Sequence, residues 1–223
     1  MNFIAPRLLL LTSALLTLAA CKSPLPKRDP ALTGPFYTPT NVQAVPLFPV
    51  AVRRVALLPA ASNDPKITEE TLRALDRTLV NTLTRSARAE VATVPRDVLV
   101  RITGRSSILS TAVLPADFMK RVAAETGADG VVFVDVTTAS AYPPLVLGLR
   151  SRLIDMASGQ PLWHFDNVFS ATDPTVVNSA RAHNIQRTSA SASPGNLTYT
   201  VLQNPLSFAD YVSTATWATL PPR

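Results

Sequence analysis

Two patterns of apolar residues alternate along the chain. Short continuous apolar runs are typical of buried β-strands, and longer stretches with apolar residues every three or four positions are typical of amphipathic helices. We predict helices that begin at Asp64-Pro65, Pro95, Pro115, Asp173-Pro174 and Asn204-Pro205, because proline suits the first helical turn. The strand-like runs are 55–58, 90–94, 131–134, 145–154 and 162–169.

The order of these segments predicts an α/β fold. We expect a two- or three-layer sandwich in which amphipathic helices pack on a mixed β-sheet of about five strands, within a single domain over 53–223. In the run 145–154, apolar positions alternate with Arg150 and Arg152, which favours one helix-covered and one wetter face. The small polar residues 188–196 predict a mobile loop.

The first 21 residues, MNFIAPRLLLLTSALLTLAAC, have the pattern of an export signal. A stretch of 13 uncharged residues follows Arg7, which is shorter than the roughly 20 residues that span a bilayer but fits a secretory signal peptide over 1–20. The end of this stretch, Leu18-Ala19-Ala20-Cys21, resembles the bacterial lipobox. The alternative is an ordinary signal peptide that happens to contain a cysteine.

The lipobox resemblance implies that Cys21 is the lipidated N-terminus of the mature chain. A diacylglycerol and an amide-linked acyl chain would attach it to a membrane, and two or more acyl chains anchor stably. Cys21 is the single cysteine, and lipidation accounts for an unpaired thiol in an exported protein. Lys22 follows, where lipoproteins of the inner membrane typically carry Asp, so the resemblance implies the periplasmic face of the outer membrane.

The segment 21–52 is rich in proline, which fixes φ and lacks an N–H, so we expect neither a helix nor an inner strand there. It predicts an extended tether that could reach up to about 90 Å. The alternative is that four of its apolar residues pack back onto the domain: Phe36, Tyr37, Leu47 and Phe48.

Composition narrows the function classes. The chain has 223 residues, a net charge of +6, 20 prolines and only 7 glycines. Its basic residues are scattered, without the basic runs or aromatic interleaving of nucleic-acid-binding proteins, so we predict no nucleic-acid partner. Attraction to anionic lipid head groups is the alternative. One cysteine and two histidines predict neither a disulfide framework nor a thiolate metal site, and we expect no cofactor.

Two sequence signatures carry a family resemblance: GADGVV at 127–132 and RLIDMASGQPLW at 152–163. Together with the order of elements over 53–170, they resemble the domain shared by the curli-secretion lipoprotein CsgG, by the N-terminal part of TolB and by the penicillin-binding-protein activator LpoB. The resemblance implies a fold that serves several functions. We do not find the two pairs of long alternating segments expected for a CsgG-like pore, and the chain is too short for the TolB propeller.

Few residues are candidates for chemistry. His164 could be a general base, but an ordinary strand histidine is the simpler interpretation, and His183 is expected to be solvated. Asp129, Asp135 and Asp155 could suggest a cation site, yet each lies at a predicted strand end or turn, where aspartate is common. The remaining candidate is Tyr142-Pro143-Pro144, which could present a surface to a partner or simply stiffen a connection.

These observations predict a non-enzymatic outer-membrane lipoprotein that acts as a periplasmic binding or scaffolding module for an envelope complex. The partners would be the membrane, through the lipid anchor, and an envelope protein. The alternative is an oligomeric component of an envelope secretion or assembly apparatus, like the curli channel. A third hypothesis, an envelope hydrolase, would have to use His164 as its base.

Overall fold

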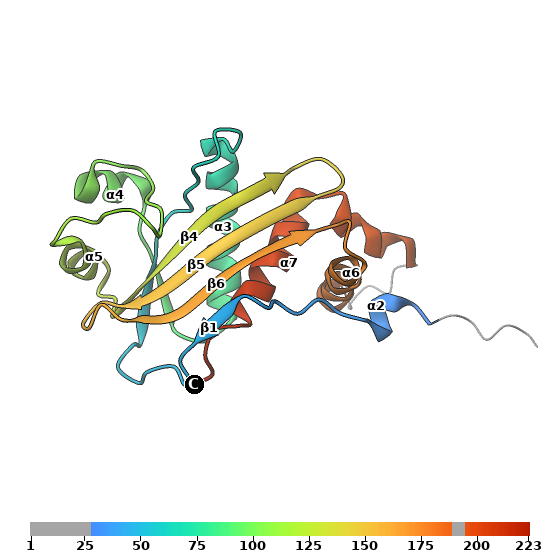
Figure 1. The fold of residues 1–223 in the computed structure, drawn as a ribbon, viewed down its shortest axis with the longest axis horizontal. Helices are drawn as coiled ribbons and strands as arrows, with labels where there is room; N and C mark the ends of the chain where they lie inside the picture. The colour runs from blue at the N-terminus through green and yellow to red at the C-terminus, as the bar shows by residue number, and fades with distance from the viewer. Residues whose placement is uncertain (1–27, 189–194) are drawn as a thin grey trace, which may run out of the picture.

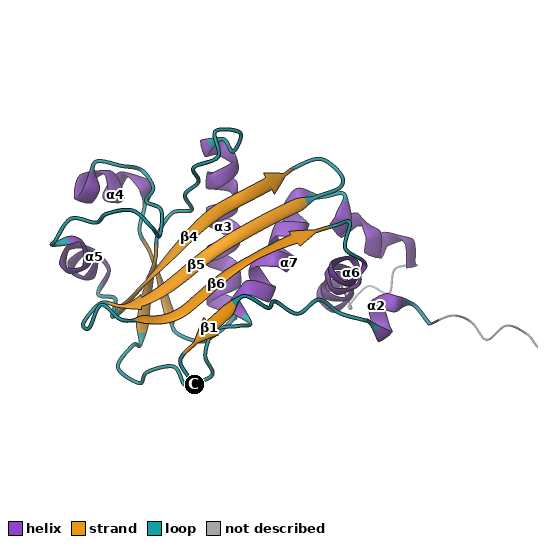
Figure 2. Ribbon diagram, in the orientation of Figure 1, coloured by secondary structure: helices purple, strands orange, loops and turns teal. Residues whose placement is uncertain are grey.

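An open six-stranded mixed sheet forms the centre of the fold (Figures 1 and 2). The computed structural model describes residues 28–188 and 195–223, so the predicted signal peptide and Cys21 lie outside it, as does most of the predicted loop 188–196. The strands are β1 (Val42–Ala44), β2 (Arg54–Leu57), β3 (Glu90–Thr93), β4 (Gly130–Ser140), β5 (Val146–Asp155) and β6 (Pro161–Ser170).

The strands lie in the order β1-β6-β5-β4-β2-β3. β2 is parallel to both β3 and β4, and the other pairs are antiparallel. The predicted α/β class and mixed sheet are therefore confirmed, and all five predicted strands are present. The additional strand is β1, which comes from the segment predicted to be a tether.

Six α-helices and one 3₁₀ helix are present among the described residues. None of the helices described is long and apolar enough to cross a lipid bilayer. The helices are α2 (Pro30–Thr33), α3 (Glu69–Arg85), α4 (Arg96–Thr103), α5 (Phe118–Thr126), α6 (Pro174–Thr188), the 3₁₀ helix η1 (Gly195–Leu202) and α7 (Pro205–Trp217).

Two hydrophobic cores divide the helices between the faces of the sheet. Helices α3, α6 and α7 pack in the larger core, and Figure 1 shows α3 and α7 behind the long strands β4, β5 and β6. Helices α4 and α5 pack in the smaller core at the β2–β4 end. Because successive strand residues point to opposite faces, Val132 lies in the larger core and Val131 in the smaller one. The continuous run 131–134 is thus explained by burial on both faces.

The start of α3 differs from the sequence prediction. Asp64-Pro65 forms a turn in which the Lys66 amide donates to the Asp64 carboxylate at 2.9 Å. The helix begins four residues later, where the Thr68 side chain accepts from the Thr71 amide at 3.2 Å and caps the first turn. The carboxylate of Asp64 accepts a hydrogen bond within its own turn and does not cap a helix. The Asp64-Pro65 sequence therefore does not mark the start of α3.

The described part of the predicted tether packs against the domain. β1 pairs with β6, and Phe48 and Val52 are buried in the larger core. Asp29 forms a bidentate ion pair with the buried Arg181 of α6, with N–O distances of 2.7 and 2.6 Å. Residues 29–52 are therefore not a free spacer, and the prediction that this segment forms no helix is wrong at α2, a short helix capped by Asp29. Of the four residues named in the alternative, Tyr37 and Phe48 pack on the core, whereas Phe36 and Leu47 are exposed.

Gly148 allows close packing in the middle of the sheet. It lies on β5 opposite a register shift in β4, where a Cβ atom would come within 2.4 Å of Thr137 Oγ1 and 2.8 Å of Thr138 Cγ2. We expect Gly148→Ala to lower the free energy of unfolding by about 3 kcal/mol, because overpacking forces neighbouring side chains and backbone to shift. Urea denaturation measures this change.

Gly104→Ala is the control for this substitution. Gly104 has a left-handed backbone (φ 76°), but nothing lies within 4 Å of an added Cβ, so only strain of about 1 kcal/mol is expected. Equal losses in the two variants would contradict the packing explanation.

Candidate binding groove

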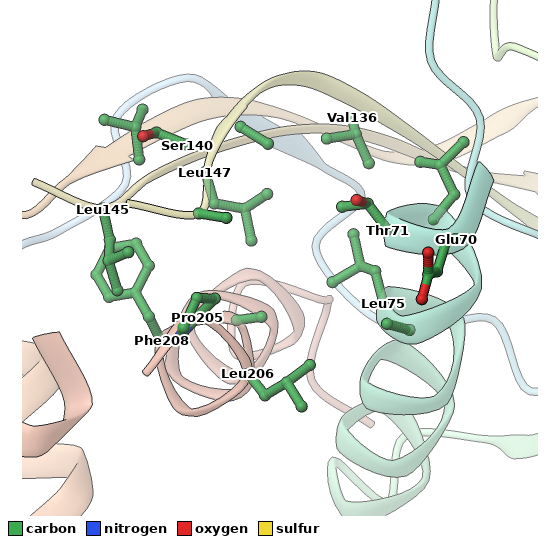
Figure 3. Close-up of a pocket in the computed structure, with 16 residues that line it drawn as sticks. Glu70, Thr71, Leu75, Val136, Ser140, Leu145, Leu147, Pro205, Leu206 and Phe208 are labelled. Carbon is green, nitrogen blue, oxygen red and sulfur yellow. The ribbon is translucent and has the colours of Figure 1, made fainter. Parts of the chain in front are cut away.

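An apolar groove of about 300 Å³ opens between α3, α7 and the β4–β5 hairpin (Figure 3). Leu75 comes from α3, Leu145 and Leu147 from the hairpin and Phe208 from α7, and these side chains lie around a common space. The first turns of both helices form one wall, and the end of the hairpin forms the other. Three elements that are distant in sequence therefore build the groove.

Small side chains explain why this region is hollow. Ala74 of α3, Ala209 of α7 and Ala139 and Ala141 of the hairpin all line the groove. An alanine side chain ends at Cβ, so the backbones approach without filling the space that a leucine would occupy. Leu206 also lines the groove and is 56% exposed, which leaves an apolar side chain available for contact.

The polar groups of the groove are few. Glu70 lies in the first turn of α3, where the helix dipole favours a carboxylate, and it is exposed. The hydroxyl of Ser140 donates to the carbonyl of Tyr142 at 2.9 Å. Asn204 caps α7 by accepting from two backbone amides, so the start of this helix already has an acceptor. The groove is thus an apolar surface bordered by one negative charge.

The predicted partner surface lies beside this groove. Tyr142, Pro143 and Pro144 form the connection between β4 and β5, and Tyr142 is 82% exposed. The residues on either side of this connection, Ala141 and Leu145, both line the groove. The connection that carries the exposed Tyr142 therefore adjoins the apolar groove, although partner binding by these residues stays a prediction.

The structure does not bring His164 together with a catalytic group. It lies on β6, opposite Arg152 of β5 and Gln43 of β1, and its Nε2 has no hydrogen-bond partner among the described residues. Burial lowers the pKa of His164, and the charge of Arg152 lowers the pKa further. The ring is therefore neutral near pH 7, in the setting of an ordinary strand histidine.

His183 is not solvated, contrary to the prediction. Its Nε2 lies 2.8 Å from Oδ2 of Asp210 on α7, and that carboxylate also binds Arg85 of α3 at 2.7 Å and Arg187 of α6. Burial raises the pKa of Asp210, but hydrogen bonds from Arg187, His183 and Arg85 outweigh it and lower the pKa to about 2. This ion network joins three helices, which sequence spacing alone did not reveal.

The three candidate aspartates serve separate structural contacts. Asp129 accepts from the amides of Arg53 and Arg54, which lowers its pKa. Asp135 accepts from the amide and hydroxyl of Ser110, and Asp155 accepts within its own hairpin turn. Among the residues described, no group of three or more His, Cys, Asp or Glu side chains could hold a metal ion.

The sequence predicted the helix that starts at Asn204-Pro205, but it did not single out Leu206 or Glu70 as residues of a binding groove. Leu206 could have been recognised, because it is a large apolar residue directly after Asn204-Pro205 that does not belong to the buried face of α7. For Glu70 no signal exists, because two glutamates in the first turn are ordinary helix chemistry.

No protein-family model and no curated protein matches the chain. Solved structures with a similar fold include the PelC dodecamer from Paraburkholderia phytofirmans, with 14% identity, 82% of this chain and 96% of that chain covered, and a TM-score of 0.48. Lipoprotein GNA1162 from Neisseria meningitidis matches with 16% identity, coverage of 63% and 99%, and a TM-score of 0.37. The LpoB C-terminal domain from Salmonella enterica matches with 16% identity, coverage of 55% and 86%, and a TM-score of 0.36. Similarities of this size do not show a family for the chain.

Proposed function

We propose that this protein is a lipoprotein on the periplasmic face of the outer membrane, and that its α/β domain is a non-enzymatic module that binds an envelope protein. The apolar groove beside Tyr142 carries the binding part of this proposal. The lipobox sequence ending at Cys21, followed by Lys22, supports the location. The candidate catalytic residues are engaged in structural contacts or isolated in a strand, which agrees with a binding role.

The groove favours a protein segment with one or two large apolar side chains next to a cation. A volume of about 300 Å³ accommodates side chains of that number, and the exposed Leu206 can contact them. Glu70 at the border is matched by a lysine or arginine of the partner, since complementary charge favours the correct partner. These features make a protein segment the proposed occupant.

The docked N-terminal segment would keep the α2–α6 end of the domain near the membrane. Eight residues lead from Cys21 to Asp29, where the ion pair with Arg181 begins the packed part of the chain. Fully extended, eight residues reach roughly 30 Å, compared with about 90 Å for a free tether up to residue 52. If Cys21 carries the lipid, the α2–α6 end of the domain therefore lies close to the bilayer.

Photo-crosslinking in cells tests the groove. The full chain carries a photoreactive residue at Leu206, and we expect an adduct with one envelope protein. Ala74→Trp fills the groove and is expected to reduce the adduct at least about tenfold, because losing a central contact commonly costs 2 kcal/mol or more. Denaturing gel electrophoresis measures the yield of the adduct, and mass spectrometry of the adduct identifies the partner.

Val113 provides the matched control position, because it is an apolar residue that is 98% exposed but lies between α4 and α5, away from the groove. A photoreactive residue there should not give the same adduct. An adduct at Leu206 that Ala74→Trp leaves unchanged would count against the groove. An adduct with a second copy of the chain would favour the oligomeric alternative instead.

A further inference from the structure

A second cleft, of about 360 Å³, lies at the opposite end of the α3–α7 pair from the apolar groove. The groove is lined by the first turns of these helices, whereas the cleft is lined by residues 82–88 and 214–218 together with α6. Trp217 lies in this wall, and its Nε1 donates to Thr82 Oγ1 at 2.9 Å, which holds the ends of α3 and α7 together. The two cavities share no lining residue.

The charged groups that line this cleft are positive. They are the guanidinium groups of Arg85, Arg88 and Arg187, and within the described part of the chain no carboxylate lines the cleft. Asp210 binds Arg85 and Arg187 but is not among the lining residues. Each guanidinium has five N–H donors, so these two contacts leave further donors on both arginines. Arg88 has no ion-pair partner among the described side chains.

A buried hydroxyl in the same cleft also lacks a partner. Thr214 Oγ1 is inaccessible to solvent and has no hydrogen-bond partner in the described structure, although Thr214 lines the cleft. Buried polar groups in proteins are rarely left unpaired, and a bound ligand is one way of satisfying them. Thr214 lies on α7, Arg187 on α6 and Arg85 on α3, so three helices contribute residues to the lining of the cleft.

We propose that this cleft binds a phosphate-bearing anion. Guanidinium groups match the geometry of phosphate oxygens through paired N–H donors. Asp210 offsets one of the three positive charges, so two remain to compensate the charge of a phosphate group. The volume admits a phosphate with a small attached group. The phosphate can belong to the head group of an anionic phospholipid or to a free phosphate or phosphate ester, and the chemistry of recognition is the same for both.

Calorimetric titration of the full chain in detergent tests the proposal. The probes are inorganic phosphate and short-chain phosphatidylglycerol, with short-chain phosphatidylcholine as the control for partition into detergent. We expect saturable binding of phosphate that Arg88→Gln weakens about tenfold, the size of one lost hydrogen bond to a charged group. Arg77→Gln is the matched control, because Arg77 is an exposed arginine of α3 outside the cleft.

A second variant distinguishes a loss of phosphate binding from a loss of folding. Thr214→Val removes a hydroxyl that has no protein partner, so it should leave the thermal midpoint of the free protein unchanged or raise it, while it weakens phosphate binding several-fold. Binding of phosphatidylglycerol at least tenfold tighter than that of inorganic phosphate would assign the lipid head group. Equal or weaker lipid binding would assign a free phosphate. Absence of saturable binding to both probes, or equal weakening by Arg88→Gln and Arg77→Gln, would overturn the proposal.

Discussion

Replacing Cys21 by alanine is expected to move the protein from the membrane fraction to the soluble periplasmic fraction, with less than about a tenth left on membranes. Each buried CH₂ of an acyl chain contributes about 0.8 kcal/mol to membrane binding, so losing several chains removes the whole anchor. Cell fractionation followed by immunoblotting measures the distribution.

The Cys21→Ala variant needs a signal peptide that can still be cleaved. It is therefore expressed with a signal peptide whose cleavage does not require lipidation, so that the mature proteins differ only in the anchor. Lys22→Asp is the companion variant, and the lipoprotein resemblance implies that it moves the protein to the inner membrane. A Cys21→Ala protein that still fractionates with membranes would contradict lipid anchoring.

Trp217→Ala is expected to lower the free energy of unfolding by about 3–5 kcal/mol, the usual range for truncating a buried tryptophan. Trp217 is 1% exposed, and its ring centre lies 5.8 Å from that of Trp163. Truncation would also remove the hydrogen bond to Thr82 that links α7 to α3. Because α3 and α7 both contribute residues to the lining of each cavity, this loss of packing should reach the binding surfaces as well. Urea denaturation followed by circular dichroism measures the change.

Trp217→Phe separates packing from hydrogen bonding. Phenylalanine keeps most of the buried area but loses the indole N–H, while the Thr82 hydroxyl still donates to the Thr78 carbonyl at 2.7 Å. The expected loss is about 1 kcal/mol, the net value of one hydrogen bond. A Trp217→Ala loss no larger than that of Trp217→Phe would show that Trp217 is not a packing centre.

Local signals in the sequence explain why several helix starts were predicted well. Pro95 precedes α4, α6 begins at Pro174, and Asn204 caps α7. Each signal acts within a few residues, so it needs no tertiary information. The apolar runs of the sheet were recognised for the same reason, because burial on one or both faces imposes its own pattern.

Long-range contacts explain what the sequence did not show. β1 has only three residues, Val42–Ala44, and its strand conformation depends on pairing with β6 more than a hundred residues later. His183 was predicted to be solvated because its hydrogen-bond partner is not close in the sequence. That partner, Asp210, lies on α7. The groove combines the starts of two helices with a distant hairpin, so only Tyr142, Pro143 and Pro144 at its border were singled out beforehand.

The mass of the native protein tests the lipid anchor most directly, and the proposed site of action depends on that anchor. Intact mass spectrometry of protein purified from membranes should show a chain that begins at Cys21 and carries a diacylglyceryl group and an amide-linked acyl chain. A polypeptide that keeps residues 1–20, or a mature chain with a free thiol at Cys21, would contradict the account.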